Sequence, residues 1–174
     1  MSLKLFSKKE KKTESYFYSE GKWIPITEQR KLMDKASEMS SEKKYDKAKE
    51  LLLRALEAKG DNPIDRHFIY NQLIDIFYKQ RDEKIDALDK CIYYCQEDIN
   101  RLTTFLEAWK KDYPHDINLP QCPSIIKLAI IFEKRGKIKE AIELCKFAIE
   151  LRLNDGTKGG FEGRLKRLEK SQNL

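Results

Sequence analysis

The chain has 174 residues, a formal net charge of +6, and 37% charged against 40% hydrophobic residues. This length suits one domain with a sizeable core, and the composition is typical of an all-helical protein with solvated outer faces. It excludes a membrane-spanning helix, since no apolar run approaches the roughly 18 residues that one needs. The N-terminus lacks the apolar core of a secretion signal, so we expect a cytoplasmic protein whose four cysteines are reduced thiols.

The positive charge is concentrated at the two ends of the chain. Residues 1–22 and residues 156–174 each carry a net charge of +3, which leaves the body neutral. Basic ends can contact nucleic acid or an acidic partner. A nucleic-acid-binding domain normally gathers its charge in one patch, however, so this reading is kept only as an alternative.

The N-terminal part is expected to form a basic tail and an aromatic arm over residues 1–26. Residues 1–15 are rich in lysine, whereas residues 16–26 hold six large apolar side chains together with Gly21 and Pro25. This composition argues against a helix and favours an extended arm, with a short hairpin turned at Glu20 and Gly21. We expect the arm to pack on the helical body; docking to a partner or to a second copy is the competing interpretation.

Four helices are predicted next, in two pairs. The first begins at Thr27 as the N-cap and the second begins at Tyr45 and ends before Gly60. The third starts near Pro63, whose missing N–H costs nothing in a first turn. The fourth is expected to run about 25 residues, from Lys84 to Lys111, because apolar residues, Ile85 among them, keep a helical period throughout.

A loop over residues 112–123 follows, and then a further helical hairpin. The loop contains three prolines, which forbid a continuous helix. The insertion is the part of the chain least dictated by a helical pattern, and is therefore a candidate for specific function. In the hairpin, Gly136 is placed to end one helix in a left-handed conformation. Residues 161–171 are predicted to form an amphipathic helix that caps the last apolar face.

The helical hairpin that follows the 112–123 loop resembles a known repeat. Its apolar and small residues fall in the order of a tetratricopeptide repeat, as seen in Ile125, Leu128, Ala129, Phe132, Gly136, Ile138, Ala141, Cys145 and Ala148. The resemblance implies an all-α fold, a tetratricopeptide-like α-solenoid of about three helical hairpins with a C-terminal capping helix and an N-terminal extended arm. The repeats would span residues 29–61, 64–98 and 122–155 of a single helical domain, 27–174. The middle repeat fits only with one extra residue in its turn.

The resemblance also implies a binding groove lined by the first helix of each repeat. The residues carried over to this groove are Met33, Ser37, Asn71, Asp75, Tyr78, Lys79, Ile126, Lys127, Ile130, Glu133 and Lys134. Most of the Lys and Asn side chains that clamp a peptide carboxylate in chaperone-binding members are absent, which argues against that ligand. The helix with Ile126 and Ile130 is apolar nearly all round, so something must cover it. The arm, the 112–123 loop, a second subunit or a foreign helix could do so.

Metal binding and catalysis have little support in the sequence. Cys91 and Cys95 could place two thiolates on one metal, with His67, His115 or Cys122 as further ligands. Cys91 and Cys145, however, stand at the same repeat position as the apolar Leu52, so we interpret them as core residues. The glycines of residues 156–163 lack the order of a phosphate loop, and no nucleophile lies beside a plausible base.

We therefore predict a non-catalytic scaffold or adaptor that binds an unidentified protein or peptide, without metal or cofactor. The alternatives are a nucleic-acid-associated protein that uses its basic ends and a homodimeric structural protein. No membrane association is expected.

Overall fold

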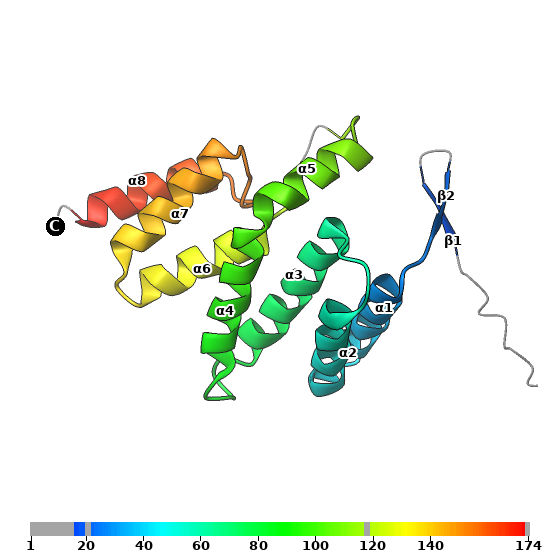
Figure 1. The fold of residues 1–174 in the computed structure, drawn as a ribbon. Helices are drawn as coiled ribbons and strands as arrows, with labels where there is room; N and C mark the ends of the chain where they lie inside the picture. Colours follow the sequence, from blue (N-terminus) through cyan, green and yellow to red (C-terminus); the bar gives the residue numbers. More distant parts are fainter. Residues whose placement is uncertain (1–15, 20–21, 117–118, 173–174) are drawn as a thin grey trace, which may run out of the picture.

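The computed structural model of the protein describes residues 16–19, 22–116 and 119–172. Within them the chain forms a two-stranded hairpin followed by eight helices (Figure 1). The elements are β1 Tyr16–Ser19, β2 Lys22–Pro25, α1 Glu28–Ser41, α2 Tyr45–Glu57, α3 Pro63–Lys79, α4 Ala87–Asn100, α5 Leu102–Asp112, α6 Pro123–Lys134, α7 Ile138–Glu150 and α8 Gly160–Gln172. The helical body is all-α, as its composition and apolar periodicity predict.

The aromatic arm is an antiparallel hairpin. Its register pairs Tyr16 with Pro25 and Tyr18 with Trp23. This confirms the extended conformation, while the turn predicted at residues 20–21 and the basic tail of residues 1–15 lie outside the described residues. The two described strands are in close contact with each other, and the hairpin projects beyond α1 (Figure 1). The packing of the arm on the helical body stays a prediction.

Local sequence signals set the helix ends. The Thr27 hydroxyl accepts a hydrogen bond from Arg30 N at 3.0 Å and so caps α1. The Asn62 side chain caps α3 in the same way, and Pro63 occupies its first turn. Gly136 ends α6 with a φ of 71°, in the left-handed region. Each of these ends was predicted from the sequence.

We expect the substitution Gly136→Ala to lower the free energy of unfolding by about 1 kcal/mol, because an L side chain is strained at positive φ. A Cβ at this position would meet no atom within 4 Å, so the cost comes from the backbone alone. The control is Gly163→Ala in α8, where a Cβ also meets nothing and φ is not positive. There alanine should stabilise the helix by about 0.5 kcal/mol. Urea unfolding of both variants measures the difference, and equal effects would contradict the argument.

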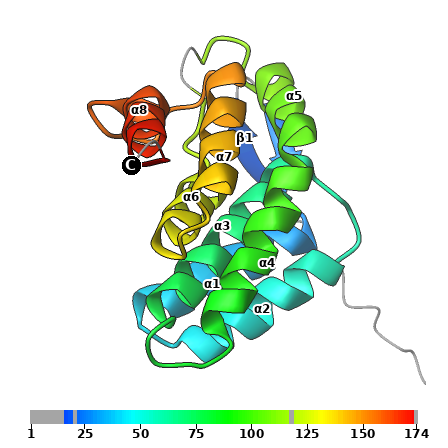
Figure 2. The same ribbon diagram turned by 90° about the vertical axis from the view of Figure 1, so that its left-hand side faces the viewer.

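The helices pack as successive pairs. The pairs α1 and α2, α3 and α4, and α6 and α7 are each in close contact, and α8 packs on α7. Between pairs, α3 contacts both α1 and α2, and α6 contacts both α3 and α4 (Figures 1 and 2). Two apolar clusters result, one centred on α1 to α4 and one on α5 to α8. Four partly buried side chains pack against both clusters and join them into one core: Phe68, Ile99, Phe132 and Leu144.

The predicted long helix is wrong in two respects. It begins at Ala87 rather than Lys84, and residues 80–86 form a turn that leaves Ile85 fully exposed instead of in the core. It is also broken at Arg101, whose φ and ψ of −108° and 1° lie outside the α-helix. The break lets α4 pack on α3 and α6 while α5 turns onto α3 (Figure 1). The apolar period continues across the break, so periodicity alone did not reveal it.

Candidate functional site

A hollow lies between α1 and α3, and we call it the α1–α3 groove. It is an open depression of about 640 Å³. Its lining residues are Arg30, Met33, Ser37, Ser40, Ser41, Phe68, Asn71, Gln72, Asp75 and Lys79. Five residues that were predicted to face a groove line it: Met33, Ser37, Asn71, Asp75 and Lys79.

The groove combines apolar and charged groups. Met33 is buried and Phe68 is half-buried, so they provide its apolar part. Two ion pairs belong to it, Arg30 to Asp65 at 2.9 Å and Lys79 to Asp75 at 2.6 Å. Burial raises the pKa of the Asp65 carboxyl, an effect that the charge of Arg30 opposes. The groove surface thus combines apolar side chains with charged side chains that form ion pairs.

A buried polar network reaches the groove from behind α3. Asp98 Oδ1 lies 2.8 Å from His67 Nδ1, and Asn71 Nδ2 lies 3.0 Å from His67 Nε2. His67 and Asp98 are only 2% and 1% exposed, and the His67 ring stacks on Phe105 at 3.7 Å between centroids. Asp98 and His67 also line a small cavity of about 50 Å³, room for a water molecule or two. Both ring nitrogens are engaged, so neither acts as a free base towards the groove.

The other predicted groove residues lie elsewhere. Tyr78 and Lys134 line a separate hollow of about 170 Å³, and the Lys127 ammonium sits 4.3 Å from the centroid of the Tyr78 ring. Ile126 packs against the second apolar cluster, to which Tyr113 and Leu119 of the 112–123 loop also belong. The described part of that loop therefore packs against the same apolar cluster as α6. Ile130 is half-buried on the same helix.

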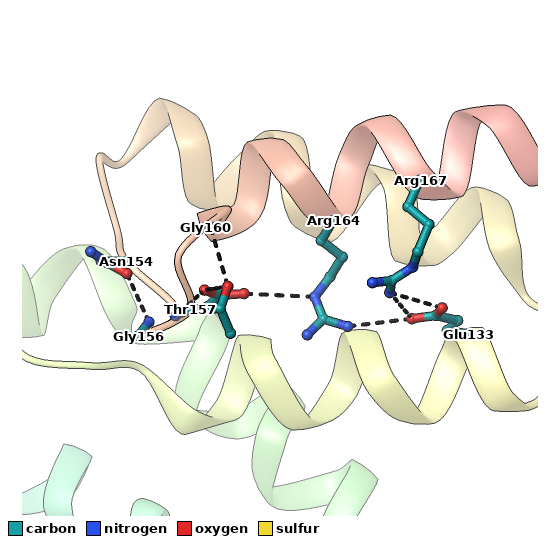
Figure 3. Close-up of polar contacts among 8 residues, drawn as sticks. Glu133, Asn154, Gly156, Thr157, Gly160, Arg164 and Arg167 are labelled. Carbon is teal, nitrogen blue, oxygen red and sulfur yellow. Dashed lines mark hydrogen bonds and ion pairs between the residues drawn. The ribbon is translucent and has the colours of Figure 1, made fainter.

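Glu133 was predicted to face the groove, but its carboxylate is bound by α8. Arg164 Nη1 lies 3.3 Å from Glu133 Oε2, and Arg167 Nη2 lies 2.9 Å from both carboxylate oxygens (Figure 3). Figure 3 shows the two arginines reaching down from α8 to α6. In the preceding turn the Asp155 carboxylate accepts a hydrogen bond from Thr157 N at 2.9 Å. The terminal helix is therefore held to the body by a polar clamp as well as by apolar packing.

We expect Glu133→Gln to loosen α8, because the variant loses the charge that faces two arginines. The expected cost is about 1 kcal/mol, the upper end for a partly exposed ion pair. Hydrogen exchange of the α8 amides should rise several-fold while exchange in α3 stays constant. The matched control is Glu143→Gln, which removes an exposed pair with Lys146 and should cost less than about 0.5 kcal/mol. Unchanged exchange in α8 would show that the clamp contributes nothing.

The four cysteines are buried free thiols. Cys91 and Cys95 belong to the first core cluster and Cys145 to the second, which agrees with their interpretation as core residues. The hydrogen bond with Cys91, together with burial, raises the pKa of Cys95 above its usual range. Among the described residues no group of three or more His, Cys, Asp or Glu side chains is arranged to hold a metal ion.

Sequence reasoning missed part of the site. From the sequence His67 was considered only as a possible metal ligand. It lies instead inside α3, and its hydrogen-bond partner Asp98 is 31 positions further along the chain. No local pattern links two such residues. Five further residues of the groove lining were also not identified: Arg30, Ser40, Ser41, Phe68 and Gln72.

Comparisons with known proteins leave the family open. No family model matches the chain, and no solved structure matches it. An uncharacterized protein of Aquifex aeolicus is 32% identical over 93 residues, which is 53% of this chain and 42% of that protein. The chain thus matches less than half the length of this relative. In the described part of the chain no helix is long and apolar enough to cross a membrane.

Proposed function

We propose that the protein is a non-catalytic scaffold that binds a protein or peptide segment, built as a tetratricopeptide-like stack of three helical hairpins with α8 as the cap. The order of neighbours supports this arrangement. Each hairpin's first helix contacts the first helix of the next hairpin, α1 with α3 and α3 with α6. Stacking of this kind forms a continuous surface from the first helices, which repeat proteins use for binding.

The observation that carries the proposal is the α1–α3 groove. It is open, it has apolar side chains at Met33 and Phe68, and it offers polar side chains from both walls. An open depression that combines apolar with polar side chains suits a peptide, which brings both kinds of group.

Two other functions are less well supported by the same geometry. A hydrolytic role for the His67–Asp98 pair would need a free ring nitrogen, and both nitrogens are hydrogen-bonded. Nucleic-acid binding by the basic C-terminal segment would need positive side chains that are free to contact phosphates. Two of them, Arg164 and Arg167, form ion pairs with Glu133 instead. Peptide binding in the groove uses neither group.

Peptides selected from a displayed random library on the immobilised chain test the proposal. Ser37 is exposed in the groove, so Ser37→Arg should fill it and weaken the selected peptides by about tenfold or more without unfolding the protein. The control is Ser171→Arg, at an exposed serine of α8 outside the groove. Affinity should change little with salt, whereas binding through basic ends falls steeply. Equal binding to both variants would refute the groove as the site.

Sedimentation of the same variants addresses the homodimeric alternative. If the wild-type chain dimerises and Ser37→Arg dissociates it, a second copy occupies the groove. If Ser37→Arg leaves the mass unchanged while the selected peptides are lost, the occupant is a different protein.

A further inference from the structure

The turn between α3 and α4, residues 80–86, presents an isoleucine to solvent at one end of the molecule (Figure 1). Ile85 is 103% exposed, although the apolar period of the sequence predicts a core position for it. Single exposed apolar side chains are common on protein surfaces and need no explanation by themselves. Two further observations distinguish Ile85: hydrogen bonds hold its turn in place, and a hollow of suitable size lies beside that turn.

The turn is an ordered segment. Within it, Glu83 N and Lys84 N donate hydrogen bonds to Gln80 O at 3.0 and 2.9 Å. Lys84 Nζ also lies 2.8 Å from Asp46 Oδ1, which binds the turn to α2. Because the turn is already formed, it loses little conformational freedom when a partner covers Ile85.

The hollow beside the turn is the one of about 170 Å³, and we call it the α4–α6 hollow. Its apolar lining comes from Tyr78, Leu88 and Ile131. Arg81 and Asp82 of the turn line it as well, so the hollow lies next to the segment that presents the isoleucine. An apolar cavity of roughly 150 Å³ holds a benzene molecule, and an isoleucine side chain has fewer carbon atoms than benzene. The hollow therefore has room for an isoleucine side chain.

Unpaired charges of opposite sign accompany the isoleucine and the hollow. Glu83 stands two residues before Ile85, and Lys134 lines the α4–α6 hollow; both are exposed. Within the described part of the chain neither Glu83 nor Lys134 forms an ion pair. The other charged side chains that line the hollow are ion-paired within the chain. One acidic and one basic side chain are thus left to face a partner.

We propose that a second copy of the chain docks on this end of the molecule, with Ile85 of each copy in the α4–α6 hollow of the other and Glu83 facing Lys134. Ile85 does not fill the hollow of its own chain, because it is fully exposed. A surface that carries both an apolar projection and a matching hollow is complementary to itself, as the interface of a two-fold dimer requires. Few side chains take part, so we expect a weak dimer, with a dissociation constant of about 10 µM to 1 mM.

The first test is sedimentation equilibrium of the whole chain at concentrations from about 10 µM to 1 mM. The average mass of the wild type should rise from one copy towards two. Ile85→Asp should weaken the dimer by about tenfold or more, and it should unfold at the same urea concentration as the wild type, since Ile85 is fully exposed. The control is Leu53→Asp, at an exposed leucine of α2 outside the hollow, which should dimerise like the wild type.

Two results of this experiment would overturn the proposal. One is a wild-type chain that stays monomeric up to about 1 mM, which would leave the hollow to a different protein. The other is an Ile85→Asp variant that dimerises as tightly as the wild type, because the contact would then lie on another surface.

The second test exchanges the two facing charges. Glu83→Lys and Lys134→Glu each place like charges opposite one another, so each variant alone should dimerise several-fold more weakly than the wild type. When the two variants are mixed, each contact again joins opposite charges, so the mixture should regain most of the dimer. Mixing cannot restore a contact within one chain. A mixture that dimerises no more tightly than either variant alone would overturn the proposal.

The proposal does not involve the α1–α3 groove, and Ser37→Arg separates the two surfaces. This variant should form the same dimer as the wild type, because Ser37 does not line the α4–α6 hollow. A dimer that Ser37→Arg dissociates and Ile85→Asp leaves intact would overturn the proposal and place the second copy in the groove.

Discussion

Replacing Phe105 by alanine is expected to lower the free energy of unfolding by about 3 to 5 kcal/mol. Phe105 is 1% exposed and lies on α5 directly after the helix break. Its ring stacks on His67 and meets Phe68 and Trp109 edge-on or tilted, at 6.3 and 6.0 Å between centroids. Truncation would leave a cavity beside a buried polar pair, so the lost packing cannot be recovered by collapse.

The control for this variant is Tyr93→Ala. Tyr93 is an aromatic residue on α4 that is 54% exposed, and its removal should cost less than about 1 kcal/mol. Urea unfolding followed by circular dichroism gives both values. A cost for Phe105→Ala that is no larger than that for Tyr93→Ala would show that α5 is not anchored on α3 through this ring. In that case the break at Arg101 would have no packing explanation.

The sequence predicts those helix ends that carry a local signal, and it misses the change of direction between α4 and α5. Thr27, Pro63 and Gly136 are local signals, since each acts on backbone groups within a few residues. The break at Arg101 has no such local signal; beyond it, the ring of Phe105 in α5 stacks on His67 of α3. The apolar period survives a one-residue break, so a helix bent around a neighbour and a straight helix look alike in sequence.

In the candidate site, too, some features were predicted from the sequence and others were not. The resemblance to a tetratricopeptide repeat implies groove-facing positions at Ser37, Asn71 and Asp75. All three line the α1–α3 groove, and their binding role stays a prediction. The prediction that Glu133 faces the groove is wrong, because its carboxylate is bound by Arg164 and Arg167 of α8. These arginines lie more than 30 residues further along the chain. Contacts between distant charged residues have no periodic signature. A sequence pattern therefore locates faces but not the long-range partners that occupy them.

Raising the pH is expected to destabilise the protein through two buried thiols. Burial raises the pKa of Cys145 from 9.0 to about 11 and that of Cys122 from 9.0 to about 12. The folded chain therefore holds these protons more tightly than the unfolded chain does. The resulting stability is fully present below about pH 9 and is lost as the pH rises through the folded-state values.

The size of the loss follows from the shifts. Each unit of pKa difference corresponds to about 1.4 kcal/mol, so by about pH 11 each thiol should lower the free energy of unfolding by roughly 2 to 3 kcal/mol. Urea unfolding of Cys145→Ala and Cys122→Ala, with reductant present, measures each share. Each variant should start less stable at neutral pH but lose roughly 2 to 3 kcal/mol less than the wild type on the way to about pH 11.

A matched control separates ionisation from packing. Leu168→Ala, which truncates a buried side chain of the same cluster as Cys145, should lower stability equally at every pH, because no proton is involved. Tyrosines and lysines also titrate in this range, but they are common to all the variants and cancel in the differences. If Cys145→Ala and Leu168→Ala show the same pH slope as the wild type, the thiol is not held protonated by the fold.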